Sequence, residues 1–251
     1  MPNTVQDKTK EKDFFNSFSA GGEYDVFTTS GYKALIEEYR KSLRVPGSTD
    51  LRVIDLGCGT GAFSREFKKM LGSDNYFYGL DLSIKSVILA ANLEPGIHFC
   101  AGDIEHCCFK DESFDIVLFS GVLHHFPDFE PCLREGYRIL RKGGCALSYD
   151  PNIKNPFMWL YRHPSSPFFS PKGKTENERL LSAQQVADGF RQAGFHNVIA
   201  RGKSGVTFKY VASTLGRVLL PFYNLLELLL GISPLASKYG SFLIGYGEKI
   251  C

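Results

Sequence analysis

Short apolar runs alternate with amphipathic stretches along most of the chain. The apolar runs are typical of strands buried on both faces, and they lie at residues 51–56, 76–80, 97–101, 114–119, 145–149, 198–200 and 242–246. Helical spacing is found between several of them, at residues 62–71, 83–91, 131–140 and 182–193, with Ser83 and Ser182 suited as N-caps and Gly194 as a stop. Because such alternation builds a mostly parallel sheet with helices on both faces, we predict a doubly wound α/β fold with a seven-stranded sheet.

The first fifty residues are expected to form helices ahead of this sheet. Residues 1–12 are charged and lack periodicity, so we expect them to be frayed. A helical stretch follows from 14 to 44, with interruptions at Gly21-Gly22 and at 28–31. Its second half has an amphipathic stripe that consists of Tyr32, Leu35, Ile36, Tyr39 and Leu43.

Two long connections interrupt the alternation of predicted strands and helices. Long connections in a compact domain are usually functional. Residues 151–181 contain five prolines and should be largely irregular. Residues 203–240 contain the most apolar run of the chain, Val218–Ile232. The polar or small residues of this run recur at steps of three or four and form one narrow stripe, which consists of Arg217, Pro221, Asn224, Glu227 and Gly231.

The run Val218–Ile232 is open to more than one interpretation. It is too short and too interrupted to span a bilayer. It fits a core or lid helix, a wall for a lipophilic ligand, or a shallow contact with a membrane surface. The basic residues that flank it are sparse (Lys209, Arg217 and Lys238), which argues against strong attraction to anionic lipid.

Composition narrows the class of protein. A chain of 251 residues with 43% hydrophobic residues is long enough for one large domain with a full core. Its net charge of +2 gives no sign of a nucleic-acid-binding surface. Seven cysteines without paired C-x-x-C spacing, and no signal peptide, are typical of reduced thiols in the cytoplasm. His106, Cys107 and Cys108 lack a second pair of ligands at metal-binding spacing, so we predict no metal site.

The most informative segment is residues 53–61, Val-Ile-Asp-Leu-Gly-Cys-Gly-Thr-Gly. A strand, a glycine turn and a helix present backbone N–H groups to a ligand, and Gly57, Gly59 and Gly61 let the backbone approach it closely. The third glycine follows the second by two residues, whereas the dinucleotide-binding fingerprint has a spacing of three. Asp55 adds a carboxylate at the strand end, which disfavours an anionic pyrophosphate and favours a cationic ligand with an amino group.

This segment resembles motif I of the class I S-adenosylmethionine (SAM) methyltransferases. The resemblance extends over residues 51–150, because residues with a place in the family pattern follow the successive predicted strands: Asp55, Asp81, Asp103, His124 and Asp150. It implies a Rossmann-like methyltransferase domain over residues 51–251. The helical cap of this domain is expected to consist of residues 1–50 and of the insert at 203–240.

The resemblance implies contacts between SAM and the loops after the first four strands. Asp81 would accept both ribose hydroxyls, and Leu82 would pack on the adenine face. Asp103 would accept from the exocyclic amine, while the backbone N–H of Ile104 reaches a ring nitrogen. Asp55 would orient the methionyl amino group. The other predicted cofactor-binding residues lie in the glycine turn and at the end of the fourth strand: Gly57, Cys58, Gly59, Gly61 and Ser120.

His124, His125 and Asp150 are the predicted catalytic residues. They follow two neighbouring strands, so all three are expected to face the transferred methyl group. Similarity to small-molecule methyltransferases with Leu-His-His at this place implies that one histidine deprotonates the acceptor oxygen, with Asp150 as its orienter, and a pKa near 6.5 suits that role. Two alternatives stay open. One histidine turns inward to bond a backbone carbonyl, or proximity and alignment alone support methyl transfer.

We therefore predict a SAM-dependent methyltransferase that acts at oxygen on a small, partly apolar acceptor, a description that includes lipophilic molecules. Tyr24 or Phe27 is expected to cover the cofactor, and the helix in residues 203–240 to line the acceptor pocket. An RNA methyltransferase fits less well, because a basic stripe is missing and residues 120–123 read Ser-Gly-Val-Leu rather than an Asn-Pro-Pro-Tyr-type sequence. A third interpretation is a non-catalytic SAM-binding subunit. The histidine pair argues against it.

Overall fold

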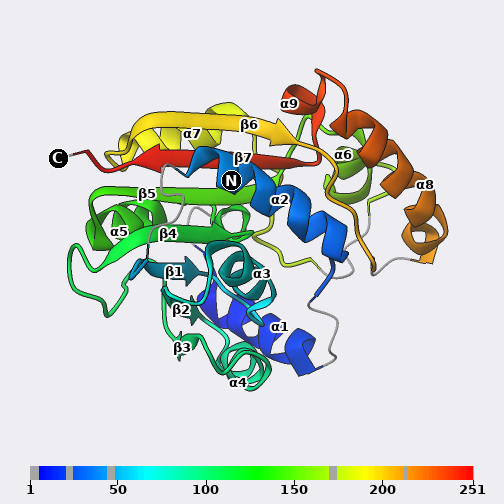
Figure 1. Cartoon of the computed structure of the whole chain (residues 1–251). Coiled ribbons are helices and arrows are strands. Elements are labelled where there is room, and N and C mark those ends of the chain that lie inside the picture. The colour runs from blue at the N-terminus through cyan, green and yellow to red at the C-terminus, as the bar shows by residue number, and fades with distance from the viewer. Residues whose placement is uncertain (1–5, 21–24, 44–48, 170–173, 212–213, 251) are drawn as a thin grey trace.

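The sheet has the strand order β3-β2-β1-β4-β5-β7-β6, which Figure 1 shows from the bottom of the view to the top. The computed structural model describes residues 6–20, 25–43, 49–169, 174–211 and 214–250. Its strands are β1 (Arg52–Leu56), β2 (Tyr76–Asp81), β3 (His98–Ala101), β4 (Phe114–Ser120), β5 (Leu140–Pro151), β6 (His196–Lys203) and β7 (Phe242–Glu248). Neighbouring strands are parallel except where β7 pairs antiparallel with β5 and β6. The predicted doubly wound, mostly parallel seven-stranded sheet is confirmed.

Apolar side chains alternate between the two faces of this sheet. Val53 belongs to the core shared with α2 (Thr29–Ser42) and α3 (Ala62–Leu71). The next residue, Ile54, belongs to the opposite core, which is shared with α5 (Glu130–Ile139) and α7 (Ala183–Gln192). A central parallel strand is covered on both faces in this way, so it needs a continuous apolar run.

Three helix boundaries follow the chemistry that the sequence predicts. The Ser83 hydroxyl accepts from the N–H of Ser86 at the start of α4 (Ile84–Leu93). Ser182 and Gln185 form a reciprocal capping box at the start of α7. Gly194, with φ 102°, follows the end of α7, where a left-handed conformation favours glycine.

Two helices precede β1 and occupy different parts of the molecule. α1 (Lys8–Ala20) packs against α4, whereas α2 packs against α3 (Figure 1). The predicted stripe of α2 is buried. The expectation that residues 1–12 are frayed is wrong for Lys8 and the four residues after it, because they form the first turns of α1 and bind partners far along the chain. Gly21-Gly22 and Tyr24 lie outside the described residues.

The proline-rich connection after β5 is irregular, as predicted, except for one short helix in its described part, α6 (Pro156–Arg162). Pro156 lies in the first turn, where a missing N–H removes no helical hydrogen bond. The Asn155 side chain caps this turn by accepting from the N–H groups of Phe157 and Met158. The Asn155 cap and the position of Pro156 in the first turn therefore allow a helix to form in a segment rich in proline.

The connection after β6 forms α8 (Thr214–Gly231), which lies beyond the carboxyl edge of the sheet near α6 and α9 (Ala236–Tyr239) (Figure 1). The polar side of α8 faces the domain. The Asn224 amide donates to the carbonyl of Phe208 at 2.8 Å and accepts from its N–H at 2.9 Å. Glu227 is 1% exposed and accepts from Asn155 Nδ2 at 3.1 Å and from Ser241 Oγ at 2.8 Å.

The apolar side of α8 faces away from the domain. Six large apolar side chains are each between 51% and 72% exposed: Val218, Leu219, Phe222, Leu225, Leu228 and Leu229. The interpretation as a core helix is therefore wrong for this side, because the polar anchors on the opposite side fix the rotation of the helix. Within the described ranges, no helix combines the length and the hydropathy needed to cross a bilayer.

Replacing Glu227 by Gln should change how stability depends on pH. Burial raises the pKa of Glu227 from 4.5 to about 7. A carboxyl group with a raised pKa contributes stability that is complete below its unfolded pKa and is lost as the pH rises to its folded pKa. Between pH 4.5 and 7.5, the free energy of unfolding of the wild type should fall by about 2–3 kcal/mol relative to Glu227→Gln, at about 1.4 kcal/mol per pKa unit.

Urea denaturation of the two proteins across this pH range measures the difference. Asn224→Ala is the matched control, because it removes the neighbouring anchor of α8 without removing a titratable group. It should lower stability by the same amount at every pH. Parallel pH profiles for the wild type and Glu227→Gln would contradict the raised pKa.

Candidate active site

The loops after β1, β2, β4 and β5 meet at one edge of the sheet because these strands are parallel. The N–H groups of Gly57 and Cys58 both donate to the carbonyl of Leu80, at 2.8 and 3.1 Å, so the turn after β1 is tied to β2. Gly57 has φ 76°, and a Cβ there would lie 2.4 Å from the side chain of Val122. This position therefore requires glycine.

Asp81, at the carboxyl end of β2, is bonded to the glycine turn. Its Oδ2 accepts from the N–H of Gly59 and its Oδ1 from the N–H of Ser83, both at 2.8 Å. Burial raises the pKa of Asp81, and these two N–H groups partly offset the rise. Leu82 next to it is half-buried, and Ile104 in the loop after β3 is buried. The structure thus brings the end of β2 against the turn after β1.

Asp55 is fully buried at the end of β1. The Ser64 hydroxyl donates to its Oδ2 at 2.6 Å. Among the described residues, Oδ1 of Asp55 and the hydroxyl of Ser120 are buried without a regular hydrogen bond. Burial raises the pKa of Asp55 to about 7, and nearby hydroxyl groups partly offset the rise. Because Ser120 lies close enough to lower the pKa of this carboxyl group without a regular hydrogen bond to Oδ1, this oxygen can still accept from a donor group of a ligand.

Helix α1 covers the loops after β2 and β3. Lys8 Nζ donates to Asp103 Oδ2 at 2.5 Å and also pairs with Glu105. The Ser83 hydroxyl donates to Asn16 Oδ1 at 2.8 Å. The predicted adenine-binding carboxylate is therefore held by a lysine of the amino-terminal helix.

A cavity of about 180 Å³ opens beside the glycine turn. Its polar side is formed by the turn, the end of β4 and the short 3-10 helix η1 (Leu123–His125), and includes Gly57, Cys58, Thr60, Ser120, His124 and His125. Its apolar side is mainly aromatic and includes Phe14, Phe15, Phe27, Tyr149, Phe208 and Phe242. A pocket with a few polar groups and an apolar wall suits a ligand with a polar end and an apolar body.

Helix α8 contacts the aromatic side of the cavity through other residues and does not line it. No described residue of α8 lines the cavity, so the prediction that this helix lines the acceptor pocket is wrong. Tyr223 of α8 packs against Phe208, with ring centroids 5.7 Å apart, and Phe208 lines the cavity. Phe27 lines the cavity as well, and its backbone pairs with that of Phe208 in a β-bridge.

Asp150 positions the ring of His124, and neither histidine bonds a backbone carbonyl through its ring in the described contacts. Asp150 Oδ1 accepts from the backbone N–H of His124 at 3.1 Å and lies 2.9 Å from its Nδ1. Since this oxygen is already an acceptor, the proton of the neutral ring belongs on Nδ1. Burial lowers the pKa of His124 well below 6.5 and raises that of Asp150. His124 is thus a neutral imidazole with an unprotonated Nε2, and the residue lines the cavity.

Three charged residues that the sequence did not single out complete this polar end. Glu178 Oε1 lies 3.6 Å from His124 Nε2 and pairs with Arg162. Glu11 Oε2 lies 3.6 Å from His125 Nδ1. These residues belong to the proline-rich connection and to the segment expected to be frayed, where neither motif nor periodicity marks a residue. The length of the connection was the one available signal.

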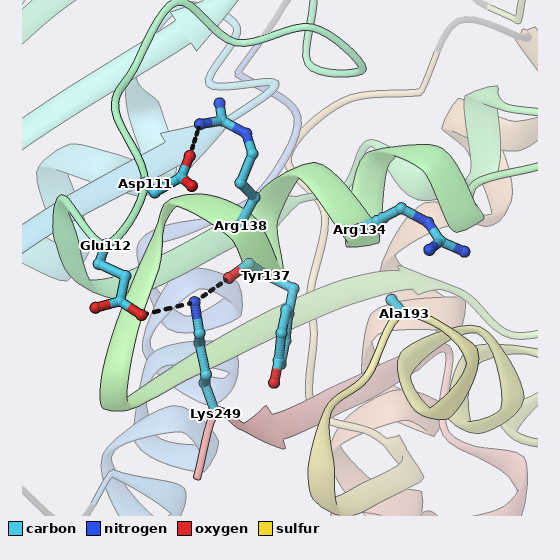
Figure 2. Close-up of a pocket in the computed structure, with 7 residues that line it drawn as sticks. All are labelled: Asp111, Glu112, Arg134, Tyr137, Arg138, Ala193 and Lys249. Carbon is cyan, nitrogen blue, oxygen red and sulfur yellow. Dashed lines mark hydrogen bonds and ion pairs between the residues drawn. The ribbon is translucent and has the colours of Figure 1, made fainter. Parts of the chain in front are cut away.

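A larger open hollow of about 640 Å³ lies at the opposite edge of the sheet, near the amino ends of β4 and β5. Figure 2 shows the residues that line it: Asp111, Glu112, Arg134, Tyr137, Arg138, Ala193 and Lys249. Four of its five charged residues form pairs, Lys249 with Glu112 at 3.5 Å and Arg138 with Asp111 at 2.5 Å, and Arg134 pairs with Glu130. Ligands of parallel sheets bind at the carboxyl edge, so we place the active site in the smaller cavity.

Comparison with known proteins identifies the family to which the chain belongs. A family model described as a methyltransferase domain matches residues 48–198. A demethylmenaquinone methyltransferase of Lactobacillus johnsonii is 30% identical over 224 residues, which cover 78% of this chain and 90% of that protein. The enzyme of the same name from Chlorobaculum parvum is 30% identical over 128 residues, and the match spans about half of each protein, 51% and 52%. The phthiotriol/phenolphthiotriol dimycocerosates methyltransferase 1 of Mycobacterium ulcerans is 38% identical over 106 residues, 41% of this chain and 39% of that protein.

A solved structure shares the fold over almost the whole chain. It is the phospholethanolamine N-methyltransferase 2 of Haemonchus contortus, in complex with phosphomonomethylethanolamine and S-adenosylhomocysteine. The TM-score is 0.67 at 15% identity, over 98% of this chain and 60% of that one. The family match spans the glycine turn, the strand-end carboxylates and the histidine pair, so the chain belongs to the class I SAM-dependent methyltransferases. SAM is its cofactor.

The ring of His124 should be neutral from pH 6 to pH 8, with its proton on Nδ1. Burial disfavours the imidazolium, and Asp150 Oδ1 is the acceptor for the Nδ1 proton. Nitrogen-15 spectra of histidine-labelled protein report both the charge and the tautomer. Asp150→Ala should remove the preference for Nδ1. A titration midpoint at or above 6.5 for His124 in the wild type would contradict this assignment.

Proposed function

We propose that the protein transfers the methyl group of SAM to a hydroxyl oxygen of a small, largely apolar acceptor of the hydroquinone class. The observation that carries the proposal is the unprotonated Nε2 of His124, whose ring Asp150 holds, beside a cavity with an aromatic side. The relatives from Lactobacillus johnsonii and Chlorobaculum parvum are named for a quinone, demethylmenaquinone, which supports an acceptor of this kind.

In this proposal the glycine turn and the strand-end carboxyl groups would hold SAM. Its methionyl ammonium would donate to Asp55, whose Oδ1 makes no regular hydrogen bond. Asp81 would accept the ribose hydroxyls through lone pairs that the N–H groups of Gly59 and Ser83 leave unused. The adenine amine would donate to Asp103, where it competes with Lys8 for Oδ2. Leu82 and the backbone N–H of Ile104 would contact the base.

Methyl transfer requires a proton to leave the acceptor hydroxyl as its oxygen attacks. Bound SAM would supply an electrophilic methyl group, because its positively charged sulfur becomes a neutral thioether and keeps the electron pair as the C–S bond breaks and the O–C bond forms. His124 takes the hydroxyl proton on its unprotonated Nε2, and Asp150 holds the ring in place. The proton passes to solvent after the methylated product leaves.

SAM should bind more tightly as the pH rises from 6 to 8. Asp55 has a pKa of about 7 without a ligand, so at pH 6 most of this carboxyl group has to lose its proton before it can pair with the ammonium. Linkage then predicts a dissociation constant about tenfold higher at pH 6 than at pH 8. Calorimetry in two buffers of different ionisation enthalpy measures the affinity and the released proton. Asp55→Asn should bind weakly at both pH values, and equal wild-type affinity at the two would refute the pairing.

Replacing His124 by Ala should lower kcat by about 10²- to 10⁴-fold, the usual contribution of a general base, while the affinity for SAM stays nearly constant. His125→Ala is the matched control, because His125 is the adjacent residue and its ring lies 4.2 Å from that of His124. It should keep kcat within about tenfold of the wild type.

A short-chain hydroquinone serves as the acceptor in these assays, and mass spectrometry and NMR identify the product. Wild-type turnover in His124→Ala would show that proximity and alignment are sufficient. A methyl group on a ring carbon would contradict transfer to oxygen. Absence of any methylated hydroquinone, with SAM bound, would reject this class of acceptor.

A further inference from the structure

The outward side of α8 is a continuous apolar stripe. Its residues recur at steps of four, three, four and three, so they lie on one side of the helix and its last turn. They are Val218 (72% exposed), Phe222 (59%), Leu225 (53%), Leu229 (53%) and Ile232 (86%). We call these five residues the α8 stripe.

The direction of the stripe is set by the inward side of α8. Asn224 bonds both backbone groups of Phe208, and Glu227 bonds the side chains of Asn155 and Ser241. Tyr223 packs its ring against Phe157 at 5.7 Å. Rotating the helix to bury the stripe would therefore break buried hydrogen bonds. Exposure of the stripe is part of the folded state.

The chemistry of the stripe suits lipid better than a protein partner. Its side chains contain no polar atom, and the helix satisfies most of its own backbone groups. Protein interfaces have about one hydrogen bond per 100–200 Å² and depend on Tyr, Trp and Arg anchors, whereas Leu and Val are under-represented among them. Acyl chains need no hydrogen bonds, and helices that lie in a membrane interface present Leu and Phe on one side.

The charges around the stripe also match a lipid surface. Among the described side chains of residues 214–239, the exposed charged ones are Arg217 and Lys238, one before the stripe and one after it. The acid of this segment, Glu227, is buried. Two cations near lipid phosphates give a modest preference for anionic headgroups, which agrees with the sparse basic flanks seen in the sequence.

We propose that α8 docks the protein on a lipid bilayer, with the α8 stripe among the outer acyl segments and Arg217 and Lys238 at the headgroups. The inward bonds of Asn224 and Glu227 keep the helix parallel to the membrane surface. Tyr223 of α8 packs against Phe208, which lines the cavity. If the acceptor is apolar, it dissolves in the lipid bilayer, and docking brings the acceptor-binding cavity close to that bilayer. That consequence rests on the proposed function, whereas the docking itself does not.

Vesicle flotation tests the docking without any acceptor. The full chain is mixed with vesicles of phosphatidylcholine alone, or of phosphatidylcholine with one-third phosphatidylglycerol, and floated through a density gradient. The test variant is Phe222→Ser with Leu229→Ser. The matched control is Ile88→Ser with Leu93→Ser, which removes two apolar side chains of equal exposure (55% and 54%) from α4. Calorimetry with SAM shows that both variants retain the fold.

We expect the wild type and the α4 control to float with both kinds of vesicle, and the α8 variant to bind at least tenfold more weakly. Lys238→Gln should lower the preference for phosphatidylglycerol about fivefold, the value of one cation near an anionic surface. Wild-type protein that stays at the bottom of the gradient overturns the proposal. So does a dimer in light scattering that the α8 variant converts to a monomer while neither protein binds vesicles, since the stripe would then be a subunit interface.

Failure of docking is distinguishable from failure of the proposed function. With a short-chain, water-soluble hydroquinone, the α8 variant should turn over at the wild-type rate. Equal flotation of the α8 variant and the wild type would also overturn the docking, whatever the activity.

Discussion

Three carboxylates are buried at one edge of the sheet, and the rest of the site depends on how their burial is compensated. Asp55, Asp81 and Asp150 are 0%, 8% and 0% exposed, and moving a carboxylate out of water costs several kcal/mol. In the described contacts none of them pairs with a lysine or arginine; N–H groups and hydroxyls bind them instead. Because those N–H groups belong to the loops after β1, β2 and β4, compensation of the charges also fixes the loops. The glycine turn and η1 are therefore in place before any ligand arrives.

What could be predicted from the sequence is local, or follows from the parallel sheet. The strands, the glycine turn and the capping serines are local patterns, and parallel strands bring the strand-end acids together without further information. The contacts that were missed join distant segments through side chains. Lys8 and Asp103 are 95 residues apart, and Glu11 and Asn177 are 166 apart, so no pattern within either segment marks its partner. Charged, aperiodic sequence predicts a frayed end when the partners that order it lie in another part of the chain.

Helix α8 shows a different limit of prediction from the sequence. Its periodicity revealed two sides correctly, but periodicity does not say which side faces the protein. Most surface helices bury the apolar side, which made a core or pocket helix the natural expectation. The outcome was decided by partners outside the helix: the backbone of Phe208, the amide of Asn155 and the hydroxyl of Ser241. A polar side with enough buried partners can hold a helix in the inverted orientation.

The ion pair between Lys8 and Asp103 joins α1 to the loop after β3. Its two side chains are 33% and 28% exposed, so salt weakens the pair. A ligand group that donates to Oδ2 of Asp103 competes with the lysine ammonium for this oxygen. Since salt screens the ammonium more than a neutral donor, higher ionic strength shifts this competition toward the neutral donor. The amino-terminal helix thus makes the carboxyl edge of the sheet sensitive to salt.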